Sequence, residues 1–160
     1  MFSSKGHQVL MYGPDFRSAD LDQYVSEYIP VVFEKDRIEW FGGTEWDKNR
    51  VFDRWNPDDV CWKTMNERTI TAIRERYQPG DQIALVAGRC QQQILDGLQD
   101  LRVIGTEPFI GYSGVLGGTH KVFESYGWRA HVAGLNHDDD VRYFDTVIPN
   151  CFDLSEFNFS

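Results

Sequence analysis

The apolar residues of this chain fall into short, strand-sized runs separated by polar or amphipathic stretches. The run at residues 7–13 (HQVLMYG) is bounded by glycines and predicts a buried strand. The run at 82–88 (QIALVAG) predicts a fully buried parallel strand, and further strands are expected at 101–105 and 143–150. These runs are too short to be taken for long helices.

A weaker apolar run at 28–33 contains Pro30. Proline has no backbone N–H to donate to a neighbouring strand, so this run predicts an edge strand or an irregular segment. The polar, Trp-rich stretch at 34–56 that follows contains two consecutive glycines and predicts a long loop with one short helix at most.

The most clearly delimited helix is expected to begin at Asn56. Asn56 suits the N-cap, Pro57 suits the first helical position, and the Pro-Gly pair at 79–80 ends the helix. The apolar face of this helix is approximate and consists of Trp62, Met65, Ile70, Ile73 and Tyr77. Further helices are expected at 91–99 and 120–135.

The alternation of strands and helices predicts an α/β fold, a Rossmann-like parallel sheet with helices on both faces. The 160 residues fit one domain, 1–160. In such sheets ligands bind at the carboxyl ends of the strands. Three segments then face the expected site: 88–93 (GRCQQQ), 106–114 (TEPFIGYSG) and 149–153 (PNCFD).

Composition and charge narrow the class of protein. Hydrophobic residues make up 41% of the chain and charged residues 26%, an ordinary globular balance. No apolar run approaches the roughly 18 residues that a membrane-spanning helix needs, and the first residues lack the apolar core of a secretion signal. The three cysteines form no CxxC pair, which suits free thiols in the cytoplasm. The net charge is −9 without clusters of Lys and Arg, so nucleic acid is an unlikely ligand.

Several stretches, in this order, resemble the GT-B glycosyltransferases that carry a Glu, seven residues, Glu donor motif. Residues 147–153 (VIPNCFD) are similar to the Val-Ile-Pro-Asn-Gly-Val-Asp segment that closes the N-terminal domain of those enzymes, with Cys151 and Phe152 in place of Gly and Val. Residues 3–13 (SSKGHQVLMYG) resemble their Gly-His-Glu-Val stretch, where the second strand begins. The segments QPGDQIALVAGRCQ, EPFIGYSG and KVFESYGW resemble a subset of the same enzymes.

This resemblance implies the acceptor-side domain of an enzyme that transfers a sugar from a nucleotide-sugar donor to an acceptor hydroxyl. It implies retention of anomeric configuration and no metal or other cofactor. It also implies that the first strand of the family fold, which lies in the middle of the sheet, and the donor-binding domain are absent from these 160 residues. On this basis the chain is expected to be a fragment, truncated at both ends, without transfer activity of its own.

Two kinds of candidate follow the strand expected at 101–105. A carboxylate at Glu107 can orient an acceptor hydroxyl and accept its proton, which makes Glu107 the candidate base; a surface glutamate in a turn is the alternative. The glycine-rich stretch after it can form a nest of backbone N–H groups for a phosphate or a sugar hydroxyl, or a plain flexible turn. That stretch comprises Gly111, Tyr112, Ser113 and Gly114.

Other polar residues complete the predicted binding set. Arg89, Gln91 and Gln92 follow an expected strand and offer donors to sugar hydroxyls or to phosphate, although a solvated loop has the same composition. His120 and Glu124 are four residues apart within an expected helix, so they can pair on one helical face or simply lie on the surface.

Cys90 is the basis of an alternative hypothesis, that the protein is a cysteine enzyme. It follows an expected buried strand and precedes a helix, where a helix N-terminus lowers the pKa of a thiol nucleophile. His120 and Glu124 then complete a triad in an α/β cysteine enzyme. Against this, Arg89 and Gln91 stand where a tight nucleophile elbow usually has glycines. A non-catalytic module that binds a sugar or a partner is the third possibility.

Two motif-like spacings are set aside. Glu67 and Glu75 reproduce the spacing of the donor motif, but they lie in a charged helix without glycine-rich surroundings, so a solvated helix face is expected. The run HDDD at 137–140 suggests a metal site, but no apolar strand precedes it, and adjacent like charges are typical of a solvated loop. No metal site is expected.

Overall fold

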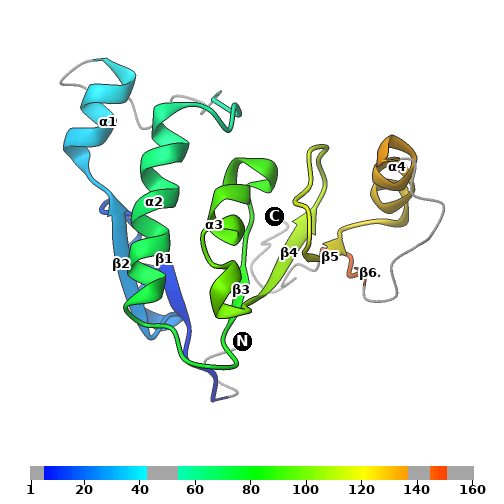
Figure 1. Cartoon of the computed structure of the whole chain (residues 1–160), viewed down its shortest axis with the longest axis horizontal. Coiled ribbons are helices and arrows are strands. Elements are labelled where there is room, and N and C mark those ends of the chain that lie inside the picture. Colours follow the sequence, from blue (N-terminus) through cyan, green and yellow to red (C-terminus); the bar gives the residue numbers. More distant parts are fainter. Residues whose placement is uncertain (1–5, 43–53, 137–144, 151–160) are drawn as a thin grey trace, which may run out of the picture.

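The structure is a computed structural model that describes residues 6–42, 54–136 and 145–150. The fold is mixed α/β, and every paired strand runs parallel to its neighbour (Figure 1). One sheet contains two strands, β1 (Leu10–Pro14) and β2 (Glu27–Val32). The second sheet contains, in chain order, β3 (Gln82–Ala84), β4 (Ile104–Ile110), β5 (His120–Phe123) and β6 (Thr146–Val147). The parallel α/β class is therefore confirmed, whereas the single continuous sheet is not found among the described residues.

The helices lie between and beside these strands. They are α1 (Glu34–Phe41), α2 (Val60–Arg74), α3 (Gln92–Asp96) and α4 (Tyr126–Asn136), with short 3-10 helices at Ala19–Gln23, Gly88–Gln91 and Gln99–Leu101. In Figure 1, α2 and α3 lie side by side over the strands, and α4 lies at the far end of the second sheet next to β5.

Helix α2 joins the two sheets through the hydrophobic core. Its Ala72 packs against the buried side chains of β2, which are Ile29, Val31 and Val32. Its Ile73 packs in a second cluster with Leu85, Ile94, Leu98 and Leu116. Tyr12 of β1 contacts both clusters, so β1 is the strand of the first sheet that faces the second. No described strand lies between β1 and β3, and this interval is termed the central gap.

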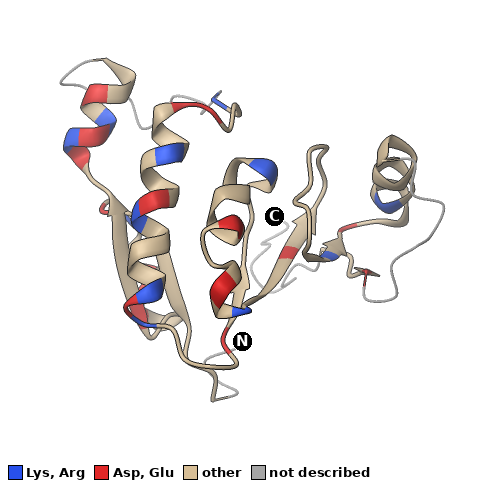
Figure 2. Ribbon diagram, in the orientation of Figure 1, with Lys and Arg blue, Asp and Glu red and all other residues tan. Residues whose placement is uncertain are grey.

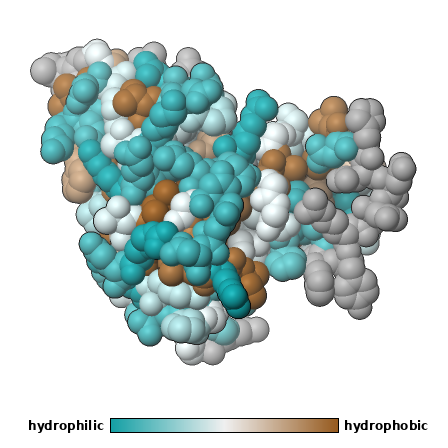
Figure 3. Space-filling view, in the orientation of Figure 1, coloured by the Kyte–Doolittle hydropathy of each residue, from teal (hydrophilic) through white to brown (hydrophobic). Residues whose placement is uncertain are grey.

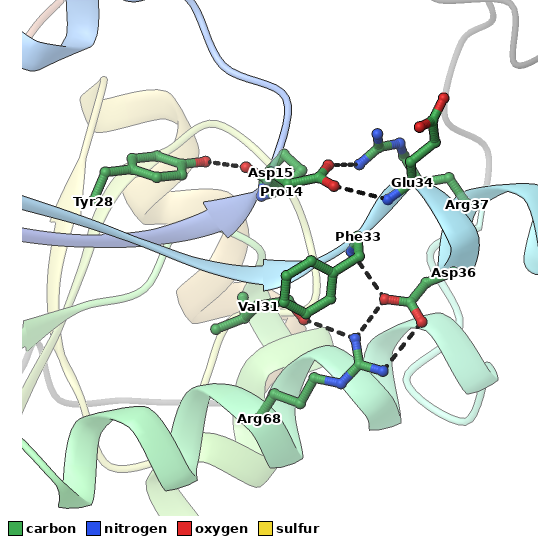
Figure 4. Close-up of polar contacts among 9 residues, drawn as sticks. All are labelled: Pro14, Asp15, Tyr28, Val31, Phe33, Glu34, Asp36, Arg37 and Arg68. Carbon is green, nitrogen blue, oxygen red and sulfur yellow. Dashed lines mark hydrogen bonds and ion pairs between the residues drawn. The ribbon is translucent and has the colours of Figure 1, made fainter.

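The outer edge of the first sheet, by contrast, is closed by side chains (Figure 4). Pro30 presents no N–H on β2. Arg68 of α2 donates to the carbonyl oxygen of Val31 at 3.1 Å, and its Nη2 lies 3.1 Å from Oδ1 of Asp36 in α1. Asp36 also accepts from the N–H of Phe33 at 2.9 Å. Hydrogen bonds from Arg68 hold the pKa of Asp36 below its ordinary range, so the carboxylate is charged at neutral pH.

Several strand predictions need correction in position or burial. The strand expected at 7–13 begins only at Leu10, and Gly13 is its single buried residue, so it is not a buried strand. The strand expected at 82–88 ends at Ala84 and is mostly exposed, because it borders the central gap; Leu85, just past its end, is 3% exposed. The edge position predicted for β2 is confirmed.

The longest helix starts later than predicted. Helix α2 begins at Val60, because Asn56 forms a turn instead of capping the helix. The side-chain oxygen of Asn56 accepts from the N–H of Asp58 at 3.1 Å, and its carbonyl oxygen accepts from the N–H of Asp59 at 3.0 Å. The helix also ends at Arg74, before the Pro-Gly pair that was expected to end it.

Two predictions next to the glycine-rich loop need correction: the bounds of the strand before it and the type of element after it. Strand β4 begins at Ile104, not 101, and continues through Pro108, because a register shift and the positive φ of Phe109 (61°) accommodate the proline. The segment expected to be one helix from 120 to 135 is divided into β5 and α4. The hydroxyl oxygen of Ser125 accepts from the N–H of Trp128 at 3.2 Å and so helps to start α4.

Candidate ligand site at the carboxyl edge of the second sheet

The turns that follow β3 and β4 pack against each other. The N–H of Arg89 donates to the carbonyl oxygen of Gly114 at 2.9 Å. Gly88 has a positive φ of 53°, and a Cβ there would lie 2.6 Å from the same oxygen, so this contact requires glycine. The side chain of Arg89 lies over Gly114, while Arg89 and Ser113 are exposed. The two turns predicted to share one edge of the sheet therefore do meet.

Glu107 lies within β4 and not in a loop, which corrects the position expected for it. It is 0% exposed. Its Oε1 accepts from the hydroxyl of Tyr112 at 2.8 Å, and its Oε2 accepts from the N–H of Leu116 at 2.9 Å. Both carboxylate oxygens are thus used to hold the glycine-rich loop, and neither faces solvent where an acceptor hydroxyl would lie.

Burial has the largest influence on the pKa values of Glu107 and Tyr112. Desolvation is the largest influence on Glu107 and raises its pKa, against the hydrogen bonds from Leu116 and Tyr112 and the charge of the buried Lys121. Desolvation also raises the pKa of Tyr112, and the hydrogen bond to Glu107 raises it further. Tyr112 therefore stays a neutral hydrogen-bond donor to Glu107.

A second polar group forms where β4, β5 and β6 end. The carboxylate of Glu124 packs directly over Gly111, at a distance that leaves no space for a side chain there. The side-chain amide of Asn150 donates to Oε2 of Glu124 at 3.0 Å, and the N–H of Glu124 donates to the carbonyl oxygen of Ile110 at 3.2 Å. Glu124 is half-buried and Asn150 is exposed. We term Gly111, Glu124 and Asn150 the Glu124 rim.

The glutamines predicted to bind ligand hold the backbone instead. The side-chain oxygen of Gln91 accepts from the N–H groups of Val86 and Ala87, both at 2.9 Å. The side-chain oxygen of Gln92 accepts from the N–H of Gly117 at 2.9 Å. These acceptors satisfy backbone groups at the end of β3 and in the glycine-rich loop, so the exposed polar surface at this edge comes from other residues.

The predicted helical pair of His120 and Glu124 does not exist. His120 is the first residue of β5 and Glu124 follows its last, so they lie at opposite ends of a strand, about 13 Å apart along the chain at the usual rise per residue. Cys90 is 3% exposed and packs with Cys61 and Trp62, and burial raises the pKa of its thiol. The arrangement needed for a cysteine triad is therefore not assembled in this structure.

Two features of this edge escaped the sequence analysis. Asn150 lies within a segment already predicted to face the site, but its partner Glu124 had been placed in a helix. Phe109 has a positive φ, which is rare for a bulky residue, and its side chain is 67% exposed beside the loop. Pro108 within the strand was a local sign of this bulge, because proline inside a sheet is found on edge strands or at bulges.

A separate surface groove lies between β2 and α2, with a volume of about 460 Å³. It is lined by Pro30, Val31, Phe33, Glu67, Arg68, Thr71, Ala72 and Glu75. Glu67, on α2, and Glu75, which caps the C-terminal end of α2, are both exposed, in line with the solvated helix face expected for this pair. None of the predicted site residues lines this groove.

Acidic and basic residues are mixed along the first two helices. Figure 2 shows basic and acidic residues interspersed along α1 and α2, and the face seen in Figure 3 is mainly hydrophilic over these helices, with small apolar areas between them. Among the described residues, no three His, Cys, Asp or Glu side chains are grouped to hold a metal ion. The HDDD run at 137–140 and residues 151–153 lie outside the described residues.

The chain matches no known protein family, no curated protein and no solved structure at a significant level. The fold alone therefore defines its class. The chain is a mixed α/β protein with parallel strands, consistent with a Rossmann-like arrangement. No helix in the described ranges is long and apolar enough to cross a membrane.

Proposed function

We propose that this chain is the acceptor-binding domain of a GT-B type glycosyltransferase that uses a nucleotide sugar as its donor. The observation that carries the proposal is the Glu124 rim, which brings together the ends of β4, β5 and β6. Asn150 belongs to the VIPN segment, one of the stretches that resemble those enzymes. The paired turns at Arg89 and Gly114 extend the same edge of the sheet.

The chemistry of this edge suits a sugar. Sugar hydroxyls both donate and accept hydrogen bonds, and the carboxylate of Glu124, the amide of Asn150, the guanidinium of Arg89 and the hydroxyl of Ser113 supply both kinds of partner. A carboxylate beside an acceptor hydroxyl also favours its attack by orienting it and taking its proton. In this proposal Glu124 has that position and Glu107 supports the loop.

Transfer itself needs positive or dipolar groups at the leaving diphosphate. Arg89 is the exposed cation of the paired turns, and its side chain is held over Gly114. The proposal assigns Arg89 to hydroxyls or to a phosphate oxygen at the boundary between acceptor and donor. Retention of configuration and the identity of the sugar belong to the donor side of the reaction.

Ligand-observed NMR with the purified 160-residue chain and a panel of monosaccharides and disaccharides tests this proposal. At least one sugar is expected to bind with a Kd of about 1 mM, a weak affinity typical of a site with few contacts. Arg89→Ala and Glu124→Gln are each expected to weaken that binding roughly fivefold to tenfold, because each removes one polar contact.

Glu67→Gln is the matched control, since Glu67 is an exposed glutamate on α2, away from this edge. Its binding curve is expected to superimpose on that of the unmodified chain. The proposal fails if no sugar in the panel binds, or if Glu124→Gln and Glu67→Gln have the same effect.

A further inference from the structure

A large aromatic side chain faces solvent at the carboxyl end of β4. Phe109, the next-to-last residue of this strand, is 67% exposed, although phenylalanine is usually a core residue. It belongs to none of the hydrophobic clusters that the described residues form. Burial of a phenylalanine normally stabilises a fold, and this position forgoes most of that contribution. Packing within the described part of the chain therefore does not explain Phe109.

The backbone turns Phe109 outward from a strand whose side chains otherwise alternate. Along β4, Gly105 and Glu107 are buried and the half-buried Thr106 separates them. Continued alternation would place Phe109 on the same buried side as Glu107. Instead the register shifts between Glu107 and Ile110, and Ile110 takes the buried position. Bulges of this kind redirect a side chain, and here the redirected side chain is that of Phe109.

The backbone of Phe109 is also strained. Its φ is 61°, in the left-handed region that bulky side chains rarely adopt. One residue thus combines an exposed apolar ring, an irregular strand register and an unfavourable backbone conformation. Such combinations concentrate at ligand sites, where the surrounding structure maintains them. Glycine or asparagine would suit this backbone better, so the aromatic ring itself is the feature that needs a function.

The ring lies within reach of the polar groups of the Glu124 rim. Two residues span at most about 7 Å, so the backbone of Phe109 is no farther than this from Gly111. Ile110, between them, is 0% exposed and packs in a core cluster with Phe123. The neighbours of Ile110 therefore face away from that cluster. On this side, the carboxylate of Glu124 packs over Gly111.

We propose that the ring of Phe109 is the stacking surface of the acceptor site, and that it selects a pyranose with a face of C–H groups. The face of an aromatic ring is electronegative and attracts the weakly positive C–H groups of a sugar. The Glu124 rim then binds hydroxyls at the edge of the sugar ring. An apolar wall with a few polar groups is the usual composition of a small-ligand site. This inference rests on the proposed function, because it specifies the class of sugar that the acceptor-binding domain takes.

Ligand-observed NMR titrations of single variants test the inference. The probe is methyl β-D-glucopyranoside, whose equatorial hydroxyls leave C–H groups on both faces, and the comparison is repeated with each sugar of the panel that binds. Phe109→Ala is expected to weaken binding about fivefold to tenfold, because it removes the stacking surface. Phe109→Tyr retains the ring and is expected to bind within about twofold of the unmodified chain.

Two controls accompany these titrations. Sorbitol offers similar hydroxyls on an open chain without a ring face, and it is expected to bind roughly fivefold to tenfold more weakly than the pyranosides. Tyr24→Ala removes another exposed aromatic ring, which precedes the amino end of β2, and should leave binding unchanged.

Phe109→Gly separates the effect of the ring from that of the strained backbone. Glycine adopts a positive φ without strain, so this variant is expected to unfold at a higher urea concentration than Phe109→Ala. Both variants lack the ring and should bind sugar equally weakly. If Phe109 acted only by shaping the loop, Phe109→Gly would recover binding, and the inference would be wrong.

The remaining outcomes distinguish this inference from the proposed function. If no sugar of the panel binds the unmodified chain, the proposed function fails, and the inference that rests on it fails as well. If a sugar binds the unmodified chain and Phe109→Ala equally, the acceptor site stands and the stacking surface is rejected. Equal binding of sorbitol and the pyranosides rejects the selection of a sugar face.

Discussion

Glu107 and Glu124 lie in or just after neighbouring strands of one sheet, yet their surroundings are opposite. Glu107 is fully buried, and both of its oxygens accept hydrogen bonds from the loop that follows its own strand. Glu124 is half-buried, packs over the backbone of Gly111 and accepts from the exposed Asn150. The comparison shows that the position of a carboxylate near a strand end does not determine its exposure or its hydrogen-bond partners. Those two properties depend on the loop that packs against each carboxylate.

The largest effect is expected from Glu107→Ala. This change leaves the hydroxyl of Tyr112 and the N–H of Leu116 without their acceptor in a buried region. Such a loss costs about 2–4 kcal/mol in the free energy of unfolding. Urea unfolding monitored by Trp fluorescence measures it. Glu124→Ala, the matched change at the partly exposed site, is expected to cost about 1 kcal/mol or less. Equal losses for the two variants would contradict the contrast.

Asp36→Asn is expected to have the next largest effect. Asp36 is buried and ion-paired with Arg68, which is about one-third exposed and also holds the β2 edge. Replacing the carboxylate by an amide weakens the ion pair without removing the side chain, at a cost of about 1–2 kcal/mol. The same urea measurement checks it. Lys63→Ala, which disrupts the exposed ion pair with Asp58, is the control and should change stability by less than about 0.5 kcal/mol. An Asp36→Asn variant as stable as this control would show that the ion pair of Asp36 with Arg68 does not stabilise the outer edge of β2.

The two buried carboxylates should respond to pH with opposite signs. The folded pKa of Asp36 lies below its ordinary 3.8, so its contribution is present above that value and is lost as pH falls through the folded pKa. The folded pKa of Glu107 lies above its ordinary 4.5, so its contribution is complete below 4.5 and is lost as pH rises through the folded pKa. The stability difference between the unmodified chain and Asp36→Asn should shrink on acidification.

For Glu107→Gln the expected change is the opposite. The stability of the unmodified chain relative to Glu107→Gln should fall as pH rises above about 4.5. Urea unfolding at intervals between about pH 3 and pH 8 measures both profiles. If both differences shrank towards low pH, Glu107 would be an ordinary paired carboxylate, and the account of its buried surroundings would be wrong.

The sequence predicts the order of strands and helices well because those signals are local. Patterns spanning a few residues predict most of these elements: apolar runs predict β1 to β4, a proline marks β2 as an edge strand, and an amphipathic pattern predicts α2. Strand β5 is harder, since its four residues join a helical pattern in Val122, Tyr126 and Ala130, and a short run does not distinguish the two periods. That error placed His120 and Glu124 on one helical face.

The site depends on contacts that no local pattern contains. The carboxylate of Glu107 is turned away from solvent by hydrogen bonds from the hydroxyl of Tyr112 and the N–H of Leu116. The carboxylate of Glu124 is positioned by Asn150, which lies 26 residues later in the chain. The central gap is also a non-local feature, because it follows from which strands pair. The prediction that the turns after β3 and β4 meet did succeed, since parallel strands end at one edge of a sheet.

Labelling of Cys90 is expected to show the smallest effect. Its burial and raised pKa predict that iodoacetamide modifies it roughly tenfold or more slowly than a free cysteine peptide near neutral pH. Peptide mapping by mass spectrometry measures the rate, with the peptide present in the same reaction as the reference. Modification faster than the reference would restore the cysteine enzyme as a candidate function.

The central claim is that the Glu124 rim, and not Glu107, contacts the ligand. The most direct test is a two-dimensional NMR titration of the same sugar into Glu124→Gln and Glu107→Gln, each compared with the unmodified chain. The account predicts that Glu107→Gln still shows shifts at Gly111 and Asn150 with a Kd within about twofold of the unmodified chain, while Glu124→Gln binds roughly fivefold to tenfold more weakly. Loss of binding in a folded Glu107→Gln variant, with unchanged binding in Glu124→Gln, would contradict it.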